Sequence, residues 1–268
     1  MILLFDIGNT HTHVGLANGR RVLKQMDIPT RDWFGGKAKT RIVKFASAKK
    51  IEGAALCSVV PCATPLVRKF VTRLGALASS AARIRNVHRA VPEAGVPLLE
   101  LTPKTVRGVG IDYPKPNSIG ADRLANAVAA KFHFGAPVVV VDFGTAVTFD
   151  VVNSKGNYIG GIIAPGLAVM TDYLHEKTAL LPKIKIRETK SIVGKSTEQA
   201  MLIGAVHGYR GLIRGLLAEL KRELKTESLP VIATGGYAEL IASKLPEISA
   251  VRPDLTLEGL RLTWQAEA

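Results

Sequence analysis

The chain has 268 residues, 47% of them hydrophobic, which is enough apolar sequence for two packed domains and excludes overall disorder. Its longest apolar stretches, such as 136–141, are far shorter than the roughly 18 residues that a membrane-spanning helix needs. The net charge of +14 favours binding of nucleotides and other polyanions. However, the basic residues are scattered along the chain, and only 6% of all residues are aromatic, so specific nucleic-acid binding is not expected.

The first predicted elements are two strands joined by a tight polar turn. An apolar run leads into Asp6-Ile7-Gly8-Asn9-Thr10, and a second apolar stretch follows as far as Asn18-Gly19. The same outline recurs at 138–146, where four valines lead into Asp142-Phe143-Gly144, and in this alignment Thr12 corresponds to Thr148. Two copies of one unit in a chain of this length predict two similar domains that arose by duplication.

Between the two copies, the pattern predicts a strand at 53–60, a helix at 64–77 and a loop rich in Pro and Gly at 106–116. We place the domain boundary near residue 117, giving domains 1–117 and 118–268. Ser118 is the predicted N-cap of the next helix, with Asp122 in its first turns. The apolar residues at helical spacing in that helix are Ala121, Leu124, Ala125, Val128 and Ala129, and Pro137 lies beyond its end.

The second half continues with long helical material at 195–224 and a short strand at 230–233. Thr234-Gly235-Gly236 then forms a turn, and a helical pattern resumes at 238–243. Mixed strands and helices in both halves predict an α/β protein in which each half is a sheet with helices packed against it.

Two further motifs have ordinary explanations. Gly194-Lys195-Ser196 resembles the end of a phosphate-binding Walker A loop, but Thr189 stands where its first glycine belongs, so we predict a helix start near Ser196 or Thr197 instead. Cys57 and Cys62 match no zinc spacing and are interpreted as small apolar residues. The chain start lacks the basic leader and cleavage site of a secretory signal, so we expect a cytoplasmic protein.

The Asp-x-Gly turns carry the predicted chemistry. A carboxylate at the end of a strand, followed by a glycine that lets a ligand approach the backbone, suits phosphate and metal, and Asp6 is a candidate Mg²⁺ ligand. One such turn is common in ordinary loops, whereas the paired occurrence at Asp6 and Asp142 favours function. Thr234-Gly235-Gly236 offers a surface for an adenine or ribose, and Gly120-Ala121-Asp122-Arg123 is by itself only a charge pair at a helix start.

Taken together, four segments resemble type III pantothenate kinases in family order. They are Asp6-Ile7-Gly8-Asn9-Thr10, Gly120-Ala121-Asp122-Arg123, Asp142-Phe143-Gly144-Thr145-Ala146 with Thr148 and Asp150, and Thr234-Gly235-Gly236. Similar supporting stretches lie at 58–61, 160–166 and 255–262. The resemblance implies a duplicated actin-like ATPase fold of the acetate and sugar kinase, Hsp70 and actin type, which is ribonuclease H-like. It also implies transfer of the γ-phosphoryl group of ATP to the primary hydroxyl of pantothenate, the first committed step towards coenzyme A.

The resemblance also implies residue roles. Asp122 matches the proton acceptor, and Asp142 the site of a monovalent cation, K⁺ or NH₄⁺, beside the Mg²⁺ that accompanies ATP. The implied ATP contacts are Asp6, Ile7, Gly8, Asn9, Thr10, His11, Thr12, His13 and Thr145. The implied substrate contacts are Tyr113, Gly120, Ala121, Asp122, Arg123 and Thr197. Members of the family are homodimers.

Two alternatives stay open from the sequence alone. The charge of +14, and the existence of family relatives named as accessory factors for transcription, allow a regulatory or nucleic-acid-associated protein on the same scaffold. The acidic turns would equally suit another actin-like kinase that acts on a sugar or a small acid. The intact candidate residues favour the pantothenate kinase.

Overall fold

The chain forms two units in the computed structural model, which describes residues 1–46, 49–83, 95–226 and 228–267. Unit 1 comprises Met1–Ala129 and Asp254–Ala268, and unit 2 comprises Ala130–Pro253. This division differs from the boundary predicted near residue 117, because the first part of the following helix and the last helix of the chain both pack within unit 1.

Unit 1 is built on a sheet with the strand order β3-β2-β1-β4-β5. The first three strands form antiparallel pairs, whereas β4 and β5 run parallel to β1. The predicted strand at 53–60 and helix at 64–77 are confirmed by β4 and α2. The elements are β1 (Ile2–Ile7), β2 (His11–Ala17), β3 (Val22–Pro29), the 3₁₀ turn η1 (Thr30–Trp33), α1 (Lys37–Ala46), β4 (Gly53–Ser58), α2 (Thr64–Arg83) and β5 (Leu98–Glu100).

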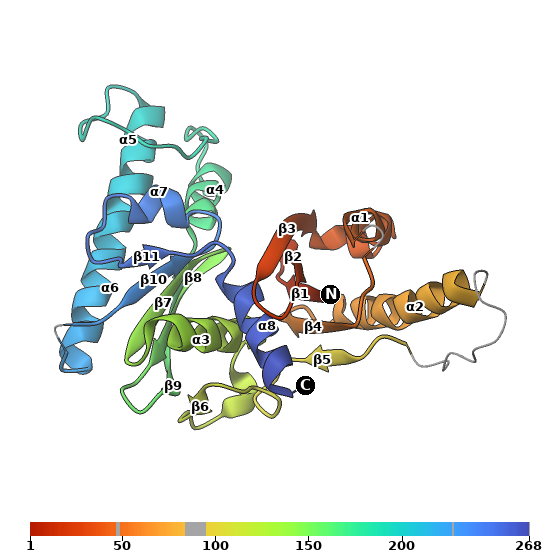
Figure 1. Cartoon of the computed structure of the whole chain (residues 1–268). Coiled ribbons are helices and arrows are strands. Elements are labelled where there is room, and N and C mark those ends of the chain that lie inside the picture. Colours follow the sequence, from red (N-terminus) through yellow and green to blue (C-terminus); the bar gives the residue numbers. More distant parts are fainter. Residues whose placement is uncertain (47–48, 84–94, 227, 268) are drawn as a thin grey trace. The chain divides into compact units, whose positions relative to one another are not determined.

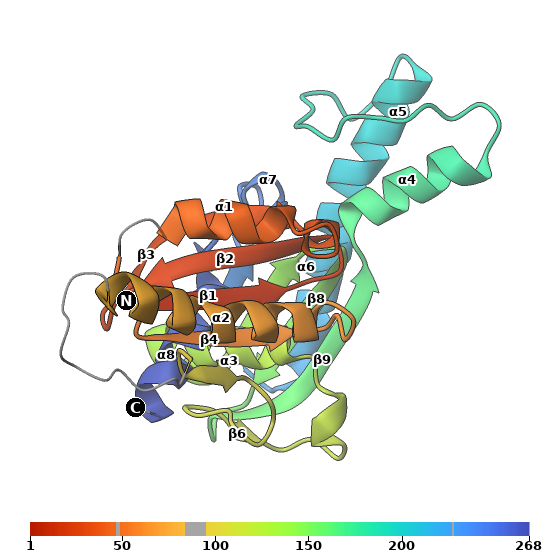
Figure 2. The ribbon, with the colours of Figure 1, turned by 90° about the vertical axis from the view of Figure 1, so that its right-hand side faces the viewer.

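Helices cover both faces of this sheet. Figure 2 looks onto the face that α1 and α2 cover, where Trp33 packs edge-on against Phe5 and Phe70 with ring centroids 6.3 and 5.7 Å apart. Figure 1 shows the last helix, α8 (Leu255–Glu267), on the other side of the same strands. There a side chain at Gly53 would overlap the ring of Trp264 as it stands, so the glycine lets that ring lie flat on β4.

The segment before the candidate base is folded differently from the prediction. After β6 (Gly110–Ile111), residues Pro116–Ser118 form a 3₁₀ turn, η2, and helix α3 (Ala121–Phe134) begins only at Ala121. Ser118 is therefore not its N-cap, and its hydroxyl instead donates to the Lys115 carbonyl at 2.8 Å. The prediction that Asp122 lies in the first turn is confirmed.

The beginning of α3 packs directly on α8 within unit 1. A Cβ at Gly259 would overlap the carbonyl of Ala125, and the Thr256 hydroxyl donates to Asn126 Oδ1 at 2.8 Å. The chain end thus returns to support the helix that carries Asp122.

Unit 2 repeats the plan of unit 1, with its strands in the order β11-β10-β7-β8-β9. Its core lies between β7, β8 and β10 and the helices α4, α6 and α7. The predicted strand and helix around 230–243 are confirmed, and so is the helical stretch after residue 195, which a π-helical turn interrupts. The elements are β7 (Val138–Phe143), β8 (Ala146–Val152), β9 (Asn157–Pro165), α4 (Leu167–Lys177), α5 (Thr197–Ile203), the π turn η3 (Gly204–Gly208), α6 (Tyr209–Glu223), β10 (Val231–Thr234), α7 (Ala238–Ala242) and β11 (Ala250–Val251). Among the helices of the described residues, none is long and apolar enough to cross a membrane.

The repeated hairpins match strand for strand but differ in their turns. Both pairs, β1–β2 and β7–β8, have strands of six and seven residues with the same succession of buried positions. Residues 8–10 join the first pair and residues 144–145 the second, so the first turn is one residue longer. The residue opposite Asp6 is consequently His13, whereas Thr148 lies opposite Asp142. The alignment of Thr12 with Thr148 is therefore wrong by one position.

Candidate active site

The predicted phosphate loop is held in shape by buried hydroxyl groups beneath it. The amide of Gly8 donates to the carbonyl of His11 at 3.0 Å and closes the turn. Thr30, from η1, donates through its hydroxyl to the Gly8 carbonyl at 2.7 Å and through its amide to the Thr10 carbonyl at 3.0 Å. The hydroxyls of Thr30 and Thr12 lie 3.1 Å apart, so the loop is braced from below while the side chains of residues 9–11 stay exposed.

Thr12 is a structural residue of this loop. It is fully buried, and its hydroxyl also accepts a hydrogen bond from the Trp33 indole at 3.1 Å. Its side chain therefore faces the core of unit 1. The ATP contact expected of Thr12 stays a prediction, and because its side chain is turned into the core, the contact would have to be made by its backbone.

A row of polar residues crosses the sheet at the end of β1. Strand pairing sets Asp27, His13, Asp6 and Cys57 side by side on β3, β2, β1 and β4. Directly paired residues project to the same face of a sheet. Asp27 Oδ1 lies 2.7 Å from His13 Nδ1, and the rings of His11 and His13 are 6.5 Å apart. The row gathers acidic and ionisable groups next to the phosphate loop.

The candidate base lies close to this row. The Cys57 thiol donates to Asp6 Oδ1 at 3.4 Å, and it is fully buried. Burial raises the pKa of Cys57 well above its usual value, and the nearby negative charges of Asp6 and Asp122 raise it further. The fold thus brings together Asp6 from the first strand and Asp122 from α3, with a neutral thiol beside them.

The start of α3 fixes the carboxylate of Asp122. Its Oδ1 accepts from the amide of Arg123 at 2.8 Å. A Cβ at Gly120 would lie 2.5 Å from the same oxygen and 3.5 Å from Val59, so any larger residue at position 120 would displace the carboxylate. Burial raises the pKa of Asp122, and the amide and the charge of Arg123 oppose that rise without cancelling it. The two residues beside Asp122 that were predicted to contact the substrate, Ala121 and Arg123, are the first and third residues of α3.

Unit 2 carries a second acidic turn of different construction. Asp142 stands at the same place on β7 as Asp6 does on β1, and Gly235 approaches it closely. Gly235 has a φ of +90°, and a Cβ there would lie 2.5 Å from Asp142 Oδ1. On the other side, the amide of Gly166 donates to the Thr145 carbonyl at 3.0 Å. Two glycine turns therefore pack against the residues that follow Asp142.

The supporting residues of this turn are also buried. Asp150 is fully buried on β8 and accepts from the Thr148 hydroxyl at 3.4 Å. Thr234, at the end of β10, is buried beside Asp142 in the parallel pair. The predicted neighbourhood of Asp142, Thr145, Thr148 and Thr234 is thus one local cluster within unit 2.

Tyr113 and Thr197 lie on other elements. Tyr113 is half-buried in the loop between β6 and η2 of unit 1. Thr197 is the exposed first residue of α5 in unit 2, directly after Ser196, whose hydroxyl caps the helix by accepting from the Gln199 amide at 3.2 Å. The predicted helix start at Ser196 or Thr197 is confirmed.

The donors at the two acidic turns differ in what they suit. The described ranges contain no cluster of three or more His, Cys, Asp or Glu residues able to hold a metal. Mg²⁺ bound with a nucleotide needs only one or two carboxylates, because phosphate oxygens and water complete its shell. The single Asp6 carboxylate beside the phosphate loop fits that requirement. Asp142, with the Gly235 turn packed against its carboxylate, stays the candidate for the predicted monovalent cation.

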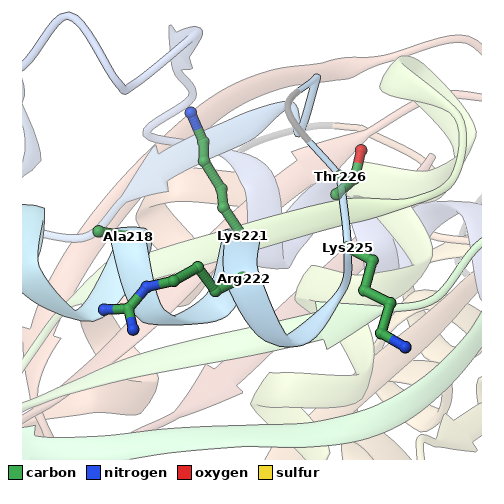
Figure 3. Close-up of a pocket in the computed structure, with 5 residues that line it drawn as sticks. All are labelled: Ala218, Lys221, Arg222, Lys225 and Thr226. Atoms are coloured by element: carbon green, nitrogen blue, oxygen red, sulfur yellow. The ribbon is translucent and has the colours of Figure 1, made fainter.

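A hollow of about 460 Å³ lies away from every predicted site residue, at the end of α6. It is lined by Ala218, Lys221, Arg222, Lys225 and Thr226, and Figure 3 shows the three cationic side chains pointing in different directions. Arg222 is also paired with Glu219. Because its charges do not converge, this hollow is not the candidate active site.

Sequence reasoning missed two residues of the site. Thr30 has no motif around it, and only its hydrogen bonds to the loop reveal its role. Cys57 was interpreted as packing, and its burial agrees with that, but its register opposite Asp6 places it in the site. The sequence signal for Cys57 was its position near the end of the predicted strand 53–60, directly before the stretch 58–61 that resembles the family.

Comparison with known proteins matches the chain to one protein family. A model of the family "Type III pantothenate kinase" matches residues 2–219. A type III pantothenate kinase of Akkermansia muciniphila is 42% identical over 261 residues, covering 97% of this chain and 96% of the relative. One of Methylacidiphilum infernorum is 40% identical over 262 residues, covering 97% and 87%.

Solved structures agree on the fold. A conserved Campylobacter jejuni protein assigned to the Baf family of transcriptional activators superposes with a TM-score of 0.56 at 17% identity, covering 99% of this chain and 98% of that one. This likeness shows the fold alone, and it confirms the predicted actin-like ATPase class with two mixed α/β sheets.

Proposed function

The chain belongs to the type III pantothenate kinase family, and on that premise we propose how its residues share the transfer of a phosphoryl group from ATP to pantothenate. The activity itself, an ATP-dependent pantothenate kinase, follows from near full-length homology. The assignment of residues is supported above all by one arrangement: the Cys57 thiol donates to Asp6 Oδ1, and Val59, two residues further along the chain, packs at Gly120 beside the Asp122 carboxylate.

Asp122 is the proposed proton acceptor. Phosphoryl transfer asks little covalent chemistry of a protein, and it depends on aligning the attacking hydroxyl and balancing charge. The raised pKa of Asp122 makes its carboxylate a better acceptor than an ordinary surface aspartate, and the Arg123 amide fixes its direction. In this proposal Asp122 accepts a hydrogen bond from the pantothenate hydroxyl and takes its proton as the bond to phosphorus forms.

The phosphate loop binds ATP. Residues 6–13 place backbone and exposed side chains around the turn, and Thr30 keeps the backbone from collapsing when the polyphosphate binds. Thr145 is the contact proposed from the second acidic turn. Gly236, where nothing lies within 4 Å of the place of a side chain, offers an open backbone surface for the nucleoside, and Gly235 fits the turn against Asp142.

The acceptor pocket is proposed around the start of α3. Gly120 and Ala121 leave room beside Asp122, and the Arg123 guanidinium pairs with the pantothenate carboxylate through two charge-assisted hydrogen bonds. Tyr113 and Thr197 complete the proposed contacts.

Two cations belong to the proposal. Asp6 is the residue that would hold Mg²⁺ together with the ATP phosphates, and Asp142 would hold K⁺ or NH₄⁺. When bound, these cations supply positive charge that offsets the phosphate oxygens.

A homodimer is also proposed, with a second copy covering one face of α4. Val169, Met170, Tyr173 and Leu174 form an apolar face on this helix and are 39–59% exposed. Exposed apolar faces of this kind typically mark protein contacts. Light scattering of the purified protein checks the mass, and Tyr173→Glu should shift it to that of a monomer. A cytoplasmic location belongs to the same proposal, since the reaction uses ATP and both cysteines are free thiols.

The test is a coupled assay of ADP release. Folded protein should consume ATP only when pantothenate, Mg²⁺ and K⁺ or NH₄⁺ are all present, and omission of either cation should remove the signal. A panel of sugars and small acids in place of pantothenate serves as the control for another acceptor. Pantothenate-independent ATP consumption, or none under any of these conditions, would contradict the proposal.

A further inference from the structure

A long segment of unit 2 leads to Thr197 without regular secondary structure. Residues 178–196 run between α4 and α5 with no helix or strand. Such a segment needs specific contacts to present one side chain in a fixed place. Its main charged contact with the rest of unit 2 is made by Glu188.

Glu188 is held by a buried arginine on α6. Arg210 Nη1 donates to Glu188 Oε1 at 3.1 Å, and Nη2 donates to Oε2 at 2.6 Å, so the pair is bidentate. Arg210 is only 5% exposed. The hydrogen bonds from Arg210 lower the pKa of Glu188 to about 2, so the carboxylate stays charged throughout the physiological range.

The same guanidinium also reaches α7. Arg210 Nη2 donates to the Leu240 carbonyl at 2.6 Å and Nε donates to the Ile241 carbonyl at 3.3 Å. These carbonyls belong to the last turn of α7, where helix carbonyls need partners from outside the helix. Helix α7 begins two residues after Gly236, so Arg210 joins the segment before Thr197 to the element that follows the Gly235 turn.

The far end of the segment is tied to α5. The Lys195 amide donates to Gln199 Oε1 at 2.9 Å, and Arg187 lies 3.4 Å from Glu198. Gly194 lies so close to Ala200 that a Cβ there would be 2.5 Å from its amide nitrogen. Glu188 is thus next in the chain to a residue that contacts α5, and the end of the segment packs on the same helix.

We propose that Arg210 and Glu188 are positioning residues that fix the segment carrying Thr197 relative to the Gly235 turn, and so set the affinity for pantothenate. This inference rests on the proposed function for the role of Thr197, but its structural part does not. Neither residue touches the reacting groups. They act on the acceptor side through the segment, and Arg210 acts on the nucleotide side through α7.

The kinetic test compares two Glu–Arg pairs whose arginines, Arg210 and Arg214, both lie on α6. Glu188→Ala removes the clamp, and Glu247→Ala removes the pair that Glu247 makes with Arg214 at 2.7 Å, away from the segment. Glu188→Ala should raise KM for pantothenate at least about fivefold, the effect expected for one charge-assisted contact, with KM for ATP within about twofold. Glu247→Ala should leave both constants unchanged. Arg210→Lys, which keeps the charge but loses the fork, should raise both KM values.

A second measurement needs no activity. The segment contains exposed trypsin sites at Lys183, Lys185, Arg187 and Lys190. With Glu188→Ala, cleavage at these sites should be several times faster than in the unaltered chain, while Glu247→Ala should match the unaltered chain. Mass spectrometry of the first fragments identifies the cleaved bonds.

The outcomes separate the two proposals. If the unaltered chain lacks pantothenate-dependent ATP consumption, the proposed function fails, and the trypsin arm alone decides the clamp. If the unaltered chain is active and Glu188→Ala behaves like Glu247→Ala in both KM and cleavage, the clamp is overturned and the proposed function stands. An effect on kcat alone, with KM for pantothenate unchanged, also overturns it.

Discussion

Asp122→Asn is the sharpest test of the site, because asparagine keeps the shape of the side chain and changes only its charge and basicity. The amide oxygen of asparagine can still accept from the Arg123 amide, which donates to Asp122 Oδ1 at 2.8 Å. Gly120 still leaves the space that the side chain needs. The variant should therefore fold and bind ATP normally.

The expected loss is in turnover. Removing a general acid or base costs about a hundredfold to ten-thousandfold in rate, and each factor of ten corresponds to about 1.4 kcal/mol, so the barrier rises by about 2.7 kcal/mol or more. Because ATP binding is retained, kcat should fall while KM for ATP stays within about twofold.

The stability of the fold should rise in this variant, although its turnover falls. The pKa of Asp122 is raised in the folded protein, so the folded state holds its proton more tightly than the unfolded chain does. Ionised Asp122 therefore destabilises the fold, and this penalty grows as the pH rises from the unfolded pKa through the folded one. Asp122→Asn should melt at a higher temperature than the unaltered chain near neutral pH, and the difference should shrink as the pH falls towards the ordinary pKa of aspartate.

Steady-state kinetics and thermal unfolding at several pH values measure both effects. Glu52→Gln is the control, since Glu52 is an exposed carboxylate of the same unit whose pKa is lowered by its contact with the N-terminal amine. It should leave kcat unchanged and give no rise in melting temperature at neutral pH. Near-normal turnover of Asp122→Asn would reject Asp122 as the base, and a melting temperature lowered at neutral pH would reject the buried-charge argument.

Two further predictions use matched pairs. Gly259→Ala places a methyl group into the Ala125 carbonyl and should lower the free energy of unfolding by about 2 kcal/mol or more. Gly211→Ala, on the open side of α6, should raise it by about 0.5–1 kcal/mol. Denaturant titration measures both changes, and equal effects would contradict the packing of α8 on α3. Cys62 is exposed and Cys57 is fully buried with a raised pKa, so a thiol reagent should modify one cysteine quickly in the native protein and the second only after unfolding; two fast thiols would refute the buried position of Cys57.

Local features of the fold were predictable from the sequence. Apolar alternation around a short polar turn determines a hairpin, and both hairpins formed where the pattern placed them. The offset of Thr12 was not predictable, because one extra turn residue leaves the spacing of apolar residues intact and shows only in the pairing of His13 with Asp6. Ser118 likewise has the chemistry of an N-cap, but Pro116 starts a 3₁₀ turn first and delays the helix.

The features of the fold and the site that the sequence did not predict depend on tertiary contacts. Nothing in the sequence near residue 259 indicates that α8 returns to support the helix of Asp122, because that contact joins the chain end to Ala125 through a bare glycine. The location of Asp122 near Asp6 was inferred from family resemblance, and the structure supports it through Cys57, which donates to Asp6, and Val59, which lies at the start of α3 beside Asp122.

The duplication explains why two similar turns can serve different ends. Cys57 pairs with Asp6 as Thr234 pairs with Asp142, so β4 and β10 hold equivalent positions in the two units. After Cys57 the chain continues through Ser58 and Val59, and Val59 lies 3.5 Å from the place of a side chain at Gly120, beside the Asp122 carboxylate. After Thr234 it continues through Gly235, which fits closely against Asp142 and Phe143, and Gly236, where nothing lies within 4 Å of the place of a side chain. If the proposed roles hold, the residues that follow these two equivalent strands differ in the way the roles require, because a desolvated carboxylate suits proton transfer and an open glycine suits a flat ligand.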